Sequence, residues 1–394
     1  MMSSTFKITH ASSKTVEVPS TFINSHVGTD DRHYPYSPPT AATREAIRNL
    51  QAQLPFASQT PLIPLPDLAK KYKQAYVFVK DESNRFGLPS FKILGASWAI
   101  YRALCQRLGL HVGCSLDVVK KAVRNAADAE LPVRLISCSA GNWGRAVARM
   151  SAVTGVEATV YLPKGTEVAT RDLIASEGVN VVMADQDYDE LVQMMWDKSR
   201  KEDLLLAMDT SWEGYEEFPR WVTEGYSAML DEVAEQVKSA CGEDITAVIA
   251  SVGVGSWAQA VVERYKGDSS SKGVMVATVE PEKAACLVAS LEAGQVTSIR
   301  TSKTIMNGMN CGTVSRIAWP ALKAGVDVAV AVDDQEVHEM VEKLMGLDLA
   351  IGPCGAADFV ALDKLYAAGQ LRDNDAGVVV VFSTEGPRDY QRPG

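Results

Sequence analysis

Lys92 is the side chain of this sequence best suited to covalent chemistry. It follows a phenylalanine in the run Ser90-Phe91-Lys92 and opens a segment with helical spacing, residues 92–109. Burial beside apolar neighbours and the positive end of a helix both disfavour an ammonium ion, so we expect the pKa of Lys92 to be lowered. An amine with a lowered pKa can form a Schiff base with a carbonyl group. The alternative is a surface lysine that keeps its ammonium group in water.

A second candidate is the glycine-rich loop Gly253-Val254-Gly255-Ser256. It follows the apolar run 245–251 and precedes a helical pattern. Backbone N–H groups at such a helix start can bind a phosphate group. A dinucleotide-binding fold is the main alternative, but the segment GVGSWA lacks the third glycine or alanine of the GxGxxG motif, and no Walker lysine follows. The loop therefore indicates a phosphate site without the usual nucleotide signatures.

Two further segments stand directly after apolar runs. The run 133–138 is followed by residues that can turn backbone N–H groups outward and form an anion-binding nest, namely Ser139, Ala140, Gly141, Asn142 and Trp143. The alternative is an ordinary turn between a strand and a helix, which uses Gly and Asn for left-handed backbone angles. The run 377–383 ends in Ser383, whose hydroxyl can cap the strand or reach a ring nitrogen.

The elements around these segments must bring them together. Short apolar runs, which we interpret as strands, alternate with helical patterns. The runs are 75–79, 133–138, 157–162, 180–184, 203–208, 245–251, 273–280, 326–332 and 377–383, and the helical patterns are 41–53, 92–109, 143–154, 167–177, 187–199, 215–238 and 334–345. This alternation indicates parallel sheets with helices on both faces. Ligands of open α/β sheets bind at the carboxyl ends of the strands, where the candidate segments stand.

The composition of the 394 residues is that of a globular protein, since 46% are hydrophobic and 22% are charged. The formal net charge of −10 and the lack of a run rich in Lys and Arg argue against nucleic-acid binding. Seven cysteines without a CxxC pair predict neither a disulfide framework nor a metal site, and they fit a reducing cytoplasm. We expect no membrane span and no secretory signal.

In their order along the chain, the four segments resemble those of fold-type-II pyridoxal-phosphate-dependent enzymes, the tryptophan-synthase-β type. Three longer runs are similar to diaminopropionate ammonia-lyases: KDESNRFGLPSFKILGAS, DTSWEGYEEFPRWVTEGYSAM and TIMNGMNCGTVSRIAWPAL. The resemblance covers about Gln53 to Asp389. It implies two α/β domains with mostly parallel twisted sheets and pyridoxal 5'-phosphate in the cleft between them. We expect an N-terminal extension over 1–55, a larger cofactor-binding domain over 56–100 and 210–394, and a smaller mobile domain over 101–209.

The resemblance also implies roles for the residues around the cofactor. Lys92 matches the family's Schiff-base lysine, and the loop 253–256 matches the phosphate loop. Asn142 matches the asparagine that hydrogen-bonds the cofactor's phenolic oxygen. Ser383 is expected to face the pyridine nitrogen, with Thr384 as a competitor. A neutral hydroxyl there favours elimination over transamination, because it leaves the ring nitrogen unprotonated.

Other residues are implied to act on the substrate. Asp209 matches an aspartate placed to take the substrate's Cα proton, although Asp209 is also suited to cap a helix near Trp212. Ser139, Ala140, Gly141 and Trp143 are expected to contact the substrate. The segment reads AGNWGR where the family reads like DGNHGR, so Ala140 replaces an aspartate and Trp143 a histidine. That aspartate is associated with D-isomers, and its loss predicts a preference for L-substrates.

The implied function is the elimination of ammonia from a small amino acid such as 2,3-diaminopropionate, giving a 2-oxo acid. The alternatives are a serine or threonine dehydratase, favoured by the run Ser139–Asn142, another β-replacement enzyme, and a cofactor-binding pseudoenzyme. We expect a cytoplasmic homodimer, although the sequence itself does not give the oligomeric state. It also does not show whether Cys286 and Cys311 form a disulfide bond.

Overall fold

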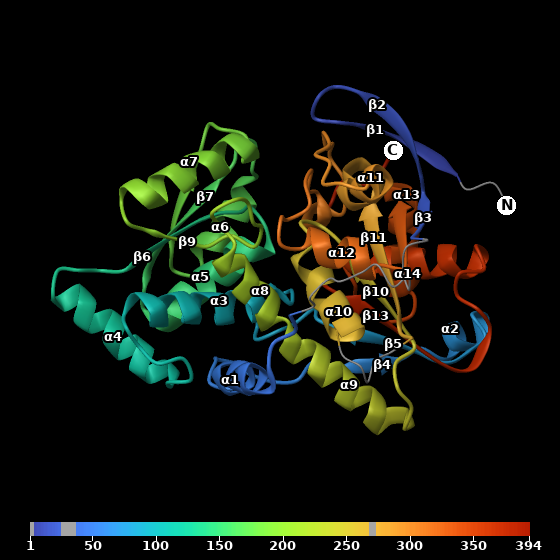
Figure 1. Ribbon diagram of the computed structural model, residues 1–394, viewed down its shortest axis with the longest axis horizontal. Coiled ribbons are helices and arrows are strands. Elements are labelled where there is room, and N and C mark those ends of the chain that lie inside the picture. Colours follow the sequence, from blue (N-terminus) through green and yellow to red (C-terminus); the bar gives the residue numbers. More distant parts are fainter. Residues whose placement is uncertain (1–3, 25–36, 268–272) are drawn as a thin grey trace.

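The computed structural model describes residues 4–24, 37–267 and 273–394, and its helices surround two separate sheets. Figure 1 shows the small sheet on the left and the large sheet on the right. No helix in these three ranges is long and apolar enough to cross a membrane. The expected α/β architecture with mostly parallel sheets is confirmed.

The large sheet has, within the described ranges, seven strands in the order β3-β12-β11-β10-β13-β5-β4. The five inner strands are parallel: β12 (Val328–Val332), β11 (Met275–Pro281), β10 (Ala247–Ser251), β13 (Asn374–Ser383) and β5 (Gln74–Asp81). The edge strands β3 (Thr21–Ile23) and β4 (Leu62–Pro64) are antiparallel to their neighbours. Along β10, Val248 and Ile249 pack into different hydrophobic clusters, so both faces of the sheet are covered. Burial on both faces explains why the strands read as continuous apolar runs.

The small sheet is parallel throughout, with the order β8-β7-β6-β9. Its strands are β6 (Arg134–Cys138), β7 (Glu157–Leu162), β8 (Asn180–Met183) and β9 (Leu205–Leu206). The predicted strand 203–208 is therefore wrong in length. The chain leaves the sheet after Leu206 because the carbonyl oxygen of Ala207 accepts hydrogen bonds from the Ser137 hydroxyl (2.7 Å) and the Trp143 indole (3.0 Å).

Helices cover both sheets and fill the space between them (Figure 1). They are α1 (Ala41–Gln51), α2 (Pro66–Lys71), α3 (Lys92–Arg107), α4 (Leu116–Asp128), α5 (Asn142–Thr154), α6 (Val168–Ala175), α7 (Tyr188–Lys201), α8 (Glu217–Gly225), α9 (Ser227–Cys241), α10 (Ser256–Gly267), α11 (Cys286–Ala293), α12 (Trp319–Gly325), α13 (Asp334–Met345) and α14 (Pro353–Ala367). Helix α3 packs against both α5 and α8. It therefore connects the end of β5 in the large sheet to the helices of the small sheet.

The helical pattern 215–238 proves to be two helices, α8 and α9, that meet at Tyr226. Helix α8 crosses α3 at Gly225, where a β-carbon would stand 2.5 Å from the carbonyl oxygen of Leu94. This crossing depends on a contact with a distant part of the chain, so the local spacing of apolar residues does not reveal it. The short helix expected at 41–53 is confirmed as α1.

Residues 4–24 of the predicted extension 1–55 lie on the large-sheet side of the molecule, whereas α1 packs against α3 and α9. Strands β1 (Thr5–Thr9) and β2 (Thr15–Pro19) form an antiparallel hairpin, and β3 adds to the edge of the sheet beside β12. Residues 25–36 of the extension lie outside the described ranges. All strands of the small sheet fall within 101–209, and those of the large sheet fall outside that range. The division into domains at these boundaries stays a prediction.

Candidate active site

Lys92 is the first residue of α3 and lies between the two sheets, opposite Asp209. Its Nζ donates a hydrogen bond to Asp209 Oδ2 at 2.7 Å, and the two side chains are 18% and 13% exposed. Burial lowers the pKa of Lys92, but the negative charge of Asp209 opposes it, and the pKa is raised well above its ordinary value. The predicted lowering of this pKa is therefore wrong, because the sequence did not show that a carboxylate would face the amine.

Asp209 stands in the segment that leaves β9, and neighbouring side chains hold that segment. The Tyr215 hydroxyl accepts from the backbone N–H of Met208 and donates to the carbonyl oxygen of Leu206. Trp212 stacks on Tyr215 with ring centroids 4.6 Å apart. Helix α8 begins only at Glu217, so Asp209 is not its N-cap and the capping alternative is wrong. The Asp209 side chain is left to interact with Lys92.

The loop Gly253-Val254-Gly255-Ser256 connects β10 to α10. Gly255 has a φ of +93°, and a β-carbon there would lie 2.9 Å from Leu322 Cδ1. A β-carbon on Gly253 would lie 2.9 Å from the carbonyl oxygen of Gly308. Both positions therefore favour glycine. Gly255 needs it for its left-handed backbone conformation, and at both positions a side chain would be too close to its neighbours. Ser256 opens α10, and its buried hydroxyl has no hydrogen-bond partner of normal geometry in the described structure. The loop has the features of an anion-binding helix start.

Ser315 connects this loop to the segment of Asp209. Its backbone N–H donates to the carbonyl oxygen of Val254 at 2.8 Å, and its hydroxyl lies 2.7 Å from that of Ser211. Two of the runs that resemble ammonia-lyases thus meet at one side chain. The contact fixes the distance between the candidate base and the candidate phosphate site.

The loop 139–143 precedes α5 and is more open. Ser139 and Ala140 are half-buried and Gly141 is exposed, while the Ser139 hydroxyl accepts from the N–H of Gly141 at 3.3 Å. Trp143 is directed inward, because its buried indole donates to Ala207. A direct contact between Trp143 and a substrate stays a prediction.

Asn142 and the end of β13 come close to each other across the site. The Asn142 side-chain Nδ2 donates to Glu385 Oε2 at 3.1 Å. Ser383 is buried at the end of β13, and its hydroxyl donates to the carbonyl oxygen of Glu385 at 3.5 Å. The neighbouring Thr384 hydroxyl is buried without a partner in the described ranges. Both hydroxyls thus stay candidates for a ring nitrogen.

Two cysteines and a tyrosine that received no role in the sequence also line this region. Cys286 donates to the carbonyl oxygen of Gly253 at 3.7 Å, and Cys311 Sγ lies 3.3 Å from where a β-carbon of Gly253 would stand. Both cysteines are free thiols, and burial raises the pKa of Cys311 to about 12. Burial also raises the pKa of Tyr226 to about 12. Tyr226 and Cys311 lie within runs that resemble ammonia-lyases, but the sequence predicted no role for any of the three residues, since only the fold brings them to the loop.

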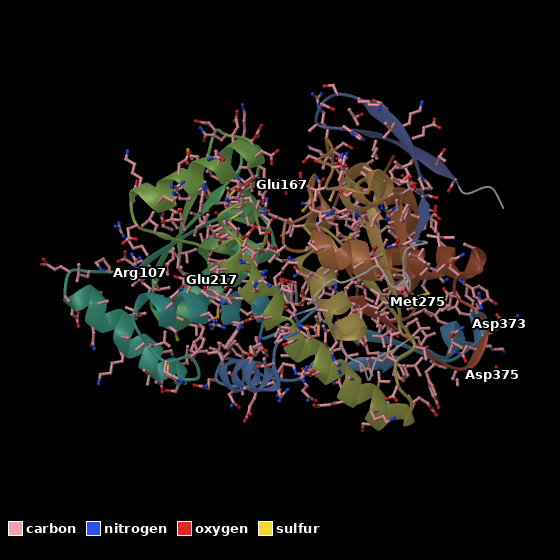
Figure 2. The ribbon with its side chains drawn as sticks, viewed as in Figure 1. Arg107, Glu167, Glu217, Met275, Asp373 and Asp375 are labelled. Atoms are coloured by element: carbon pink, nitrogen blue, oxygen red, sulfur yellow. The ribbon has the colours of Figure 1, made fainter. Side chains whose placement is uncertain are left out.

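The opposite end of the large sheet carries no candidate residue. Figure 2 labels Asp373 and Asp375 at the amino end of β13, on the side of the molecule away from the small sheet. The candidate residues instead follow the carboxyl ends of β5, β6, β9, β10 and β13, as the rule for open α/β sheets predicts.

Residues 54–384 match the family model described as pyridoxal-phosphate dependent enzyme. The chain belongs to this family. Pyridoxal phosphate is therefore its cofactor, and the resemblance found in the sequence is confirmed. Diaminopropionate ammonia-lyase from Escherichia coli K12 is 30% identical over 347 residues, which cover 84% of this chain and 85% of the relative.

Comparison with solved structures supports the same family assignment. The crystal structure of the E. coli diaminopropionate ammonia-lyase in complex with D-serine has a TM-score of 0.81 and 27% identity, covering 93% of each chain. Threonine deaminase isoform 2 from Solanum lycopersicum has a TM-score of 0.70 at 19% identity, covering 94% of each chain, which shows a shared fold.

The residues of the site fit the cofactor of the family. Lys92 supplies an amine, Gly253 and Gly255 form a cradle that a side chain would fill, and the Ser256 hydroxyl has no hydrogen-bond partner of normal geometry in the described structure. A phosphate group accepts hydrogen bonds from such a loop, and a buried hydroxyl without a partner costs free energy until it is satisfied.

Proposed function

We propose that this enzyme is an ammonia-lyase that eliminates the β-amino group from a small amino acid of the 2,3-diaminopropionate kind. The released aminoacrylate would hydrolyse to pyruvate, so one substrate and one water yield pyruvate and two ammonia molecules. The observation that carries the proposal is the carboxylate of Asp209 at 2.7 Å from the Lys92 amine. A base held there lies next to the Lys92 nitrogen, which the amino group of a substrate would replace on the cofactor. The similarity to diaminopropionate ammonia-lyase supports the substrate class.

Each residue of the site then has a defined task. The bound cofactor supplies the electron-withdrawing ring that acidifies the substrate's Cα–H. Lys92 would anchor it, and the N–H groups of the loop 253–256 would bind its phosphate. Asn142 would donate to its phenolic oxygen, while Ser383 or Thr384 would donate to the ring nitrogen. A hydroxyl, unlike a carboxylate, does not hold that nitrogen protonated, which favours expulsion of the β-substituent over transamination.

Asp209 is the proposed base for the Cα proton, and we propose that it serves L-substrates. On the other side of the site, Ala140 has no group that accepts a proton, and Ser139 and Gly141 offer only a hydroxyl and backbone N–H groups. We propose that this loop binds the substrate's carboxylate. A base has to lie within about 3 Å of the proton that it removes, so an enantiomer presenting its proton to Ala140 is a poor substrate.

A dehydratase acting on serine or threonine is the second candidate, favoured by the open run Ser139–Asn142. Both functions form a 2-oxo acid from an amino acid, and they differ in the leaving group. The test is an assay of 2-oxo acid and ammonia over L-2,3-diaminopropionate, L-serine and L-threonine. Two ammonia molecules per pyruvate, with the highest kcat/KM for the diamine, support the proposal. A higher kcat/KM for a hydroxyamino acid rejects it, and binding of the cofactor without turnover indicates a pseudoenzyme.

We further propose that the enzyme acts in the cytoplasm as a homodimer. The basis is the resemblance together with seven free cysteines, which suit a reducing compartment. Light scattering on a size-exclusion column measures the oligomeric state directly, and a monomeric mass for the active holoenzyme contradicts the dimer.

A further inference from the structure

Glu385 is a buried residue, 5% exposed, that follows the two candidate hydroxyls of Ser383 and Thr384. Its backbone pairs with that of Ser90 in an isolated antiparallel bridge, and the next residue's N–H donates to the carbonyl oxygen of Pro89 at 3.0 Å. The Ser90 hydroxyl in turn accepts from the backbone N–H of Lys92 at 3.4 Å. The backbone of Glu385 is therefore tied to the loop that ends at the cofactor-anchoring lysine.

The carboxylate of Glu385 is held on two sides. Oε1 accepts from the backbone N–H of Cys354 at 3.2 Å, in the first turn of α14, and lies 3.3 Å from Nε of Arg388. A backbone N–H of a helix start and a guanidinium thus hold the same carboxylate oxygen. A β-carbon on Gly352 would lie 2.9 Å from Glu385 Cγ, so little space is left for another rotamer. The position of this carboxylate is thus set by the large-sheet side of the molecule.

The other oxygen, Oε2, accepts from Nδ2 of Asn142 on α5, across the site at 3.1 Å. An ionised carboxylate only accepts hydrogen bonds, so it selects the NH₂ end of the amide over its carbonyl end. The same nitrogen carries a second hydrogen, for which the described residues provide no further partner. Without Glu385, the amide is free to turn over and present its carbonyl oxygen to the site.

We propose that Glu385 is a positioning residue for the cofactor, because it fixes the Asn142 amide with its second N–H directed at the phenolic oxygen. This inference rests on the proposed placement of Asn142 beside that oxygen. An N–H donor stabilises the oxygen as a phenolate, whereas a carbonyl group facing it stabilises the neutral phenol. The two forms of the lysine-bound cofactor differ in colour, since the phenolate form absorbs in the visible range and the phenol form in the near ultraviolet. Glu385 therefore sets the ratio of the two absorption bands in the resting enzyme.

The variant that tests the proposal is Glu385→Gln, which preserves the shape of the side chain but introduces an amide that donates as well as accepts. The visible band of the resting holoenzyme should fall and the near-ultraviolet band rise, and the affinity for pyridoxal phosphate should weaken by about tenfold. Asn142→Ala should shift the spectrum in the same direction. The double variant should show no further shift, because both changes remove one interaction. Glu202→Gln, which changes an exposed carboxylate paired with Lys198 outside the site, should leave the band ratio close to that of the unmodified enzyme.

Different outcomes reject different parts of the argument. If Asn142→Ala changes the spectrum and Glu385→Gln does not, the role of Glu385 is wrong while the placement of the cofactor stands. Additive shifts in the double variant also reject positioning through Asn142. If Asn142→Ala leaves both bands unchanged, the placement of Asn142 is wrong and the inference fails with it. Substrate turnover plays no part in these measurements, so they do not depend on the identity of the amino acid.

Discussion

The loops 253–256 and 139–143 both connect a parallel strand to a helix, but they differ in how tightly the fold constrains them. In the first, Gly253 and Gly255 have no space for a β-carbon, and Ser256 is buried. In the second, a β-carbon on Gly141 would meet nothing within 4 Å, and the residues before it are only half-buried. The resemblance implies that the first loop keeps the family's residues, whereas the second carries the replacements at Ala140 and Trp143.

This difference separates the tasks of the two loops. A phosphate site depends on backbone geometry, which few substitutions tolerate, while a substrate loop depends on side chains that can change without disturbing the core. Trp143 is the exception in this loop, because its buried indole donates to Ala207 in the core although its position in the loop suggested substrate contact. We therefore expect substitutions in the loop 253–256 to abolish function and substitutions in the more open loop 139–143 to alter substrate selectivity.

The largest effect is expected at Lys92. Lys92→Ala should abolish turnover and the borohydride-reducible cofactor adduct, because no other amine occupies the family position. Lys92→Arg is the matched control: it keeps a cation beside Asp209 but forms no Schiff base, so it should fold normally and also be inactive. Absorption spectra before and after borohydride, with circular dichroism for folding, provide the measurement. An active Lys92→Ala enzyme with the adduct intact contradicts the assignment.

Gly255→Asp should prevent retention of the cofactor. A side chain there collides with Leu322 at a φ of +93°, and its charge repels phosphate. Gly242→Asp is the control, since Gly242 has a φ of +77° but open space around it, so this variant carries similar backbone strain away from the site. Titration of the apoproteins with pyridoxal phosphate compares the two. Equal affinities in both variants are incompatible with a phosphate site in this loop.

Asp209→Asn should lower kcat/KM for L-substrates by about 10²–10⁴-fold, because an amide of the same shape is no base. The variant should still bind the cofactor through Lys92, which separates this effect from that of Gly255→Asp. Steady-state kinetics with L-2,3-diaminopropionate measure the loss. Near-normal activity shows that another group removes the Cα proton.

A smaller effect is expected from the open loop. The unmodified enzyme should prefer L- over D-enantiomers of 2,3-diaminopropionate and serine by about 10²-fold or more, since Ala140 provides no base for the D-isomer. Ala140→Asp should recover part of the D-activity while leaving cofactor affinity unchanged. Comparable kcat/KM values for D- and L-substrates in the unmodified enzyme contradict this prediction.

The smallest effect concerns the hydroxyl at the ring nitrogen. Removing one hydrogen bond changes an equilibrium by up to about tenfold. Comparing Ser383→Ala with Thr384→Val should therefore identify one variant with lowered cofactor affinity and one without. If both variants bind the cofactor normally, neither hydroxyl contacts the ring.

Much of the fold was predictable from the sequence because strands buried on both faces read as apolar runs. Helix α14 was missed for a related reason. It is buried on nearly all sides, so it lacks the alternation of apolar and polar faces that marks a surface helix. The role proposed for Glu385 was not predicted either, because a lone acidic residue after a strand has no local signature.

The sequence by itself determined the family and the cofactor, and it predicted Lys92 as the anchor and the loop 253–256 as the phosphate site, since each depends on residue types at short and regular spacing. Tertiary structure alone decided what faces these residues. Asp209 lies 117 positions from Lys92 and Glu385 lies 243 positions from Asn142, so no local pattern links either pair. The electrostatic environment of Lys92 follows from that long-range pairing. Its pKa is raised rather than lowered because the fold places a carboxylate opposite the amine.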